Sequence, residues 1–139
     1  TTPVHVAHHP PGTPKTVDLR VGQHPTYDRV VIDLTGAVPG YDVRSVSSLH
    51  YDPSGESVPL RGAHFMQVTL TPSAAHDSQG GSLYVGPLLA QYAMPALRGV
   101  AFIGDFEGVV TFGLSLSGVR AFRVFELHAP TRIVIDLHH

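Results

Sequence analysis

The stretch "RVVIDLTG", residues 29–36, recurs almost letter for letter as "RIVIDLHH", residues 132–139, in a chain of 139 residues. Within each copy, aliphatic residues occupy alternate positions, the two-residue period that places successive side chains on opposite faces of a β-strand. We therefore predict two equivalent strands whose aliphatic faces are buried and whose arginine and aspartate point outward. The predicted buried positions are Val30, Ile32, Leu34, Ile133, Ile135 and Leu137.

A similar alternation runs through residues 16–21, 64–71 and 109–116, and glycine, proline and serine separate these segments. Short alternating segments with turn signals about every ten residues are typical of an antiparallel sandwich or barrel. The sequence therefore predicts an all-β fold, an antiparallel β-sandwich of about eight short strands. At most one short helix is expected, in "PLLAQYAMPALRG", residues 87–99.

The first fifteen residues, "TTPVHVAHHPPGTPK", contain four prolines and no hydrophobic periodicity. Proline cannot donate to a backbone ladder, so this composition favours a linker or extended arm over a helix or a central strand. We predict a proline-rich arm over residues 1–15 and one folded domain over residues 16–139.

Composition excludes several classes of function. The formal net charge is −2 and charged residues make up 14% of the chain, so no basic surface points to nucleic acid. The apolar runs are much shorter than the ~18–20 residues of a transmembrane helix. Cysteine is absent, which removes disulfides, thiolate nucleophiles and cysteine-bound zinc. We expect no cofactor.

Histidines gather in the arm at positions 5, 8 and 9. Neutral imidazoles bind zinc, copper and nickel, but a proline-rich arm is poorly suited to hold them in a fixed geometry, so solvated side chains are favoured over a metal site. His138 and His139 could begin a purification tag, and no function is assigned to them.

No catalytic signature is present. The chain lacks the G-x-S-x-G, H-E-x-x-H, G-x-x-x-x-G-K-[ST] and G-x-G-x-x-G patterns. Asp105 and Glu107 lie two apart in "GDFEG", so a strand would bring both carboxylates to one face, where they could hold calcium or act as acid and base. This hydrolase is a minor alternative, and we predict a protein that is not an enzyme.

Three segments carry a family resemblance: "YDRVVIDLTGAVPGYDVR" at 27–44, "LRGVAFIGDFEGVVTFGLSLSG" at 97–118 and "FRVFELHAPTRIVIDL" at 122–137. Together they resemble the AMIN-like domain of actinobacterial secreted proteins and lipoproteins, a relative of the AMIN domain of cell-wall amidases. The resemblance implies a non-catalytic, extracytoplasmic β-sandwich that places proteins at the cell envelope. The arm would then correspond to a tether leading to a lipidated N-terminus outside this chain.

The partner implied by the resemblance is peptidoglycan or a wall-associated protein. The repeated strands suggest where contact could occur, since each carries an arginine and an aspartate on its outward face. We expect binding residues at Tyr27, Arg29, Asp33, Arg132 and Asp136. Cross-strand Arg–Asp pairs should add about 0.2–1 kcal/mol each and help fix the register. An alternative is a protein-interaction module that accepts a partner's strand at an exposed sheet edge.

Overall fold

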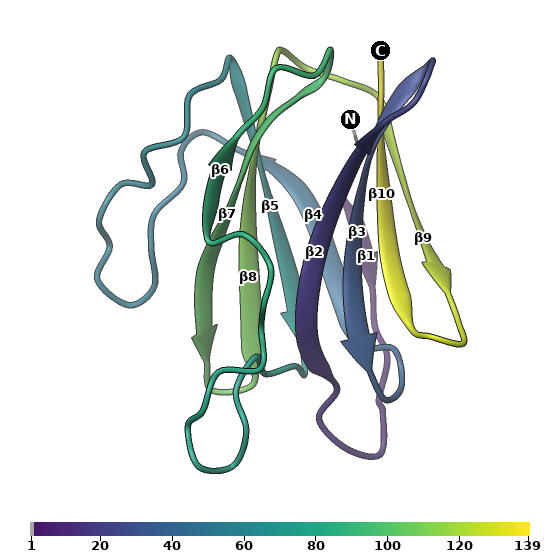
Figure 1. The fold of residues 1–139 in the computed structure, drawn as a ribbon, viewed down its shortest axis with the longest axis vertical. Helices are drawn as coiled ribbons and strands as arrows, with labels where there is room; N and C mark the ends of the chain where they lie inside the picture. Colours follow the sequence, from purple (N-terminus) through teal and green to yellow (C-terminus); the bar gives the residue numbers. More distant parts are fainter. Residues whose placement is uncertain (1) are drawn as a thin grey trace.

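The computed structural model describes residues 2–139 as two antiparallel sheets packed face to face in a sandwich (Figure 1). This confirms the all-β prediction, with ten strands in the described part of the chain. The strands are β1 (Val4–Val6), β2 (Lys15–Gln23), β3 (Tyr27–Thr35), β4 (Gly40–Val46), β5 (His64–Thr71), β6 (Leu89–Gln91), β7 (Leu97–Phe106), β8 (Val109–Leu116), β9 (Phe122–Leu127) and β10 (Arg132–His138).

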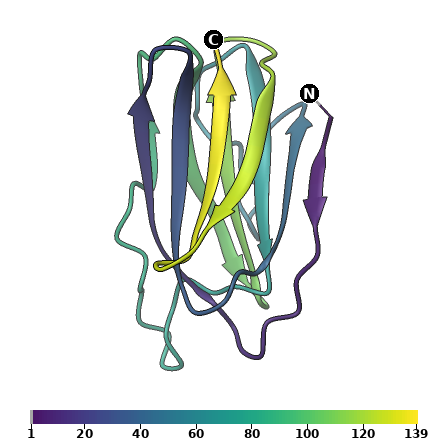
Figure 2. The same cartoon turned by 90° about the vertical axis from the view of Figure 1, so that its right-hand side faces the viewer.

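The larger sheet has six strands in the order β1-β4-β5-β8-β7-β6, and the smaller has four in the order β2-β3-β10-β9. Figure 2 shows the smaller sheet facing the viewer, with no other segment in front of it. The main core fills the space between the sheets and is built from the inward residues of both, with Phe112 of β8 among its largest fully buried side chains.

The two repeated stretches form β3 and β10, which pair with each other at the centre of the smaller sheet. Val31 stands opposite Val134, Arg29 opposite Asp136, and Asp33 opposite Arg132. This antiparallel register relates the two copies by a local two-fold axis through the Val31–Val134 pair. The six aliphatic residues predicted to be buried are at most 3% exposed, so the predicted inner faces are confirmed.

The expected helix over residues 87–99 is wrong. This segment forms the short edge strand β6, a turn, and the beginning of β7. Pro87 begins the segment and Pro95 lies within it, and the buried carboxylate of Asp28 accepts hydrogen bonds from the backbone N–H groups of Ala96 and Leu97 at 2.7 and 2.9 Å. Those N–H groups are therefore satisfied without a helix. No helix capable of crossing a membrane occurs within residues 2–139.

The proline-rich arm contains one strand of three residues, β1, which pairs with β4 at the edge of the larger sheet. Side-chain hydrogen bonds also hold the arm against the sandwich. His8 Nε2 lies 2.7 Å from Glu126 Oε2, and the hydroxyl of Tyr41 donates to the same oxygen at 2.8 Å. The rest of the arm passes below the sandwich in Figure 2 and joins the outer strand of one sheet to the outer strand of the other.

The connection between β4 and β5, residues 47–63, folds over the outer face of the larger sheet. Leu49, Val58 and Leu60 pack there against Ala101 and Ile103 of β7 in a second, smaller core. This cover explains why the residues of β8 that point away from the main core are also buried. They are Thr111, Gly113 and Ser115.

The buried repeat generates a stability prediction. Ile32→Ala and Ile135→Ala should each lower the free energy of unfolding by about 2–5 kcal/mol, because each removes buried methylene groups and leaves a cavity. Chemical denaturation followed by circular dichroism measures the change. Arg132→Ala, on the outer face of the same pair of strands, is the control and should cost less than about 1 kcal/mol. Equal losses from the isoleucine and arginine changes would contradict the assigned faces.

Candidate binding face of the four-stranded sheet

The outward side chains of the smaller sheet form three rows across its strands, which follow from the register. One row contains Arg29, Asp136 and Arg123, and the next contains Val31, Val134 and Phe125. The third places Asp33 beside Arg132 and Leu127. We call this surface the arginine face; it comprises these nine residues together with Arg20, His24 and Tyr27. All five residues expected to bind a ligand therefore lie on one face.

Asp136 is the centre of the first row. Arg29 donates to both of its oxygens in a bidentate pair, Nε to Oδ1 at 2.7 Å and Nη2 to Oδ2 at 2.9 Å. Arg123 adds two longer bonds to Oδ2, at 3.2 and 3.1 Å. The side chain of Asp136 is 0% exposed, against 26% for Arg29 and 61% for Arg123. The carboxylate points outward as predicted but is covered by its neighbours, so it supports the face instead of contacting solvent.

Burial alone would raise the pKa of Asp136, but the hydrogen bonds from Arg29 and Arg123 outweigh it and hold the pKa below its ordinary value. The same carboxylate raises the pKa of Arg29 through the bidentate hydrogen bond. Both groups are thus charged at neutral pH. A buried carboxylate shared by two guanidinium groups fixes the position of those groups.

Aromatic rings hold the same two arginines from the side. The guanidinium carbon of Arg29 lies 5.2 Å from the ring centre of Tyr27 and 5.4 Å from that of Phe125. The corresponding distance from Arg123 to Phe125 is 4.8 Å. These distances are within the range of cation–π attraction. Tyr27 therefore has a structural role on this face, and its ring also stacks on His24.

The second expected Arg–Asp pair does not form. Asp33 stands opposite Arg132 in the ladder, but its carboxylate instead accepts a bidentate pair from Arg20 of β2, at 2.7 and 2.9 Å. Arg132 donates to the backbone carbonyls of Pro130 and His128, at 3.1 and 3.4 Å. No carboxylate among residues 2–139 forms an ion pair with Arg132, so its charge is not neutralised by a neighbouring side chain in this part of the chain.

A cavity of about 300 Å³ lies over this part of the face. Arg20, Arg29 and Arg132 line it together with His24, and Val31 and Val134 form an apolar floor. Planar guanidinium groups around an apolar floor suit a ligand that carries a carboxylate or phosphate. Sequence reasoning missed Arg20, Arg123, His24 and Phe125. The outward alternation of "TVDLRV" could have indicated Arg20, whereas nothing in the sequence indicates that Arg123 shares an aspartate with Arg29.

The other candidate sites have different surroundings. Glu107 lies in the tight turn between β7 and β8 with a φ of 52°, and Asp105 is paired with His76, Oδ2 to Nδ1 at 2.6 Å. The two carboxylates therefore do not share a strand face. His5 and His8 each pair with a carboxylate. Within the described residues, no three side chains of His, Cys, Asp or Glu are grouped so that they could hold a metal ion.

The surroundings of Asp136 predict that replacing it by asparagine lowers the free energy of unfolding more than the same replacement of Asp33. Asp136→Asn should destabilise the domain by at least about 2 kcal/mol, because it removes a buried charge that receives hydrogen bonds from two arginines. Asp33→Asn is the matched control, on the equivalent position of the repeat. It should cost less than about 1 kcal/mol, since its partner Arg20 is 55% exposed. Urea denaturation at neutral pH measures both values, and equal costs would contradict the special role of Asp136.

The lowered pKa of Asp136 also predicts a pH dependence. Its ion pairs stabilise the fold fully above the pKa of the unfolded chain, about 3.9, and this contribution is lost as the pH falls through the lower pKa of the folded state. The stability difference between the parent and Asp136→Asn should therefore shrink as the pH is lowered from about 5 towards 2. Denaturation curves across that range measure it. A difference that stays constant would show that the carboxylate is not held in its charged form by folding.

The sequence was compared with curated proteins and with profiles of protein families. No curated protein matches the sequence significantly. The profile of the AMIN-like domain, in contrast, matches residues 14–139, which include nine of the ten strands and every residue of the arginine face. The match confirms the resemblance carried by the strand segments, and the chain belongs to the AMIN-like domain family.

Proposed function

We propose that this domain is a non-catalytic module that holds a protein at the cell wall, and that the arginine face is its contact surface. AMIN-like domains are related to the AMIN modules of cell-wall amidases, which supports an extracytoplasmic cell-wall context. In this proposal the arm connects the domain to a lipid anchor outside this chain, and the ligand is peptidoglycan.

The observation that carries the proposal is the position of Arg132. Its guanidinium group lines the same cavity as those of Arg20 and Arg29, but it has no carboxylate partner among the described residues. Peptidoglycan stems carry free carboxylates, which pair with guanidinium groups in a bidentate geometry. Asp33 and Asp136 hold Arg20 and Arg29 in place, so the cavity is organised before a ligand arrives.

Co-sedimentation with purified peptidoglycan tests the proposal. The parent protein should pellet with the wall material, and Arg132→Gln should weaken binding about tenfold, the effect of removing one charged hydrogen-bonding group. Arg98→Gln changes an exposed arginine of β7 in the other sheet and should bind like the parent. If the parent protein remains entirely in the supernatant at both low and moderate salt, the proposed function is wrong.

A second candidate function has its own observation. β6 is the last strand of the larger sheet and has only three residues, and its own Leu89 and the nearby Val85 and Leu88 are 45%, 81% and 65% exposed. An open edge next to exposed aliphatic side chains is suited to accept a strand from another protein. Under this alternative the partner is a wall-associated protein and the wall contact is indirect.

Crosslinking in cells separates the two functions. A photoreactive residue at position 88 should capture protein if the edge is the interface, whereas one at position 127, which lines the cavity without supplying a guanidinium group, should capture glycan-bearing wall fragments if the arginine face is the interface. The unmodified parent, irradiated in parallel, is the control. If only the probe at position 88 yields products and these contain protein without glycan, the edge function replaces the arginine-face function.

A further inference from the structure

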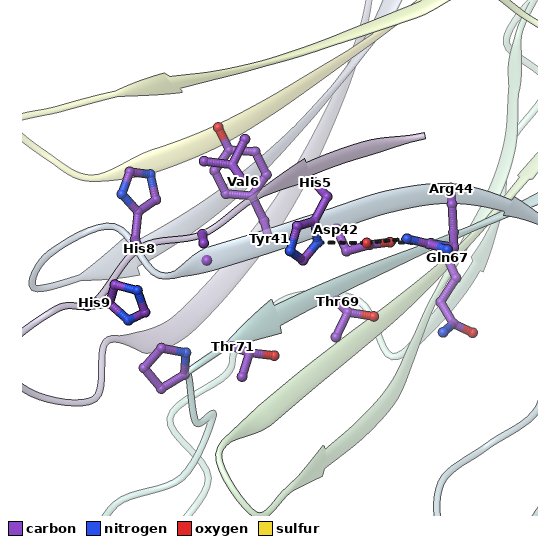
Figure 3. A pocket seen from close by; sticks show the side chains of 13 residues that line it. His5, Val6, His8, His9, Tyr41, Asp42, Arg44, Gln67, Thr69 and Thr71 are labelled. Carbon is purple, nitrogen blue, oxygen red and sulfur yellow. Dashed lines mark hydrogen bonds and ion pairs between the residues drawn. The ribbon is translucent and has the colours of Figure 1, made fainter. Parts of the chain in front are cut away.

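A larger cavity lies on the opposite side of the molecule. Its volume is about 530 Å³, and it opens on the outer face of the six-stranded sheet over β1, β4 and β5 (Figure 3). The arm forms one wall through Ala7 and His9, and the sheet forms the floor. This volume is within the range of small-molecule sites in proteins, roughly 300–1,000 Å³. We call it the arm cavity.

The charges in the arm cavity cancel. Asp42 receives a bidentate pair from Arg44, Nε and Nη2 each at 2.5 Å from a carboxylate oxygen, and His5 Nδ1 lies 3.0 Å from the same carboxylate. The hydrogen bond from Arg44, opposed in part by burial, lowers the pKa of Asp42 and keeps it ionised. One anion and one cation at neutral pH give no net attraction for a charged ligand. In this respect the arm cavity differs from the arginine face.

Hydrogen-bonding groups without internal partners line the floor. Gln67, Thr69 and Thr71 alternate along β5, so their side chains point to the same side, about 7 Å apart from one to the next. None of the three forms a side-chain hydrogen bond to another residue in the described part of the chain. Together they offer an amide and two hydroxyls, each able to donate and to accept. Pro72, Ala7 and Gly40 supply apolar surface beside them.

The arm packs closely against this floor, so the positions of the arm, β4 and β5 together set the shape of the cavity. A Cβ atom at Gly40 would lie 2.8 Å from the carbonyl oxygen of Thr71 and 3.2 Å from that of Val6. Only glycine allows the arm, β4 and β5 to approach each other so closely here. The pairing of β1 with β4 and of β4 with β5 occupies the facing backbone edges of these strands, so an incoming peptide could pair only with the outer edge of β1, which is three residues long.

We propose that the arm cavity binds a neutral oligosaccharide. Sugars present adjacent hydroxyls that both donate and accept, and they have apolar faces formed by C–H groups. The paired carboxylate and guanidinium, the amide and the two hydroxyls match the hydroxyls, and the proline and alanine surface matches the C–H face. Balanced charge disfavours anionic ligands, and the unpartnered polar groups disfavour wholly apolar ones. The inference is independent of the arginine face and does not require that face to bind the wall.

NMR titration of the uniformly ¹⁵N-labelled protein tests this inference. The probes are cellotetraose, maltotetraose and chitotetraose as neutral sugars, with tetragalacturonate as the anionic comparison. At least one neutral sugar should shift amide resonances of β1, β4 and β5 in a saturable way, while tetragalacturonate should not. Absence of saturable shifts with all three neutral sugars would overturn the inference, as would shifts confined to the four-stranded sheet or a response to tetragalacturonate alone.

A pair of variants checks the assigned contacts. Thr69→Val combined with Thr71→Val keeps the shape and the β-branching of both side chains but removes the two hydroxyls, and should weaken binding of the sugar about tenfold. Thr35→Val, the same change at an exposed position at the end of β3, is the matched control and should bind like the parent. Unchanged affinity in the double variant would overturn the assignment. Because the titration of the parent maps the site directly, the inference stays testable even if the double variant folds poorly.

Discussion

The pairing of β3 with β10 is the constraint on which the rest of the structure depends. These strands come from opposite ends of the chain, and their register places Ile32 against Ile133 on the inner face and Arg29 against Asp136 on the outer face. A slip of one residue would expose the aliphatic set and bury the charges. The bidentate Arg29–Asp136 pair is satisfied only in the observed register, so the same contact that organises the outer face also fixes the core.

Much of the fold could be predicted from local alternation, because the inward residues of β3 and β5 follow a two-residue period that reflects burial on one side. β10 has the same period of aliphatic residues, although its outward Val134 and Asp136 are buried as well. The prediction failed where distant contacts decide the conformation. Residues 87–99 contain leucines, alanines and a methionine, which have good helix propensity. The carboxylate of Asp28 and the pairing with β8 hold part of this segment as strand instead. No pattern in the neighbouring sequence indicates either of these contacts.

For the candidate sites, too, local alternation predicted some features, whereas contacts between distant residues could not be predicted. Alternation was sufficient to place Tyr27, Arg29, Asp33, Arg132 and Asp136 on one face, but it could not determine which arginine pairs with which aspartate. Arg20 and Arg123 come from the flanking strands and compete for the two carboxylates, leaving Arg132 without one of them. The arm cavity was beyond prediction, because the arm lacks periodicity and its path depends on Asp42, Glu126 and the space left by Gly40.

The flap formed by residues 47–63 has a small core of its own, separate from the core between the sheets. Leu49 rests directly on the backbone at Gly113, where a Cβ atom would lie 2.7 Å from its side chain. Few buried side chains hold this segment, so it can open in a local fluctuation while the sandwich stays closed. We expect the amide hydrogens of the flap itself to exchange with solvent sooner than those of β3 and β10. Evolution can also lengthen the exposed turn of the flap without disturbing either of the surfaces described above.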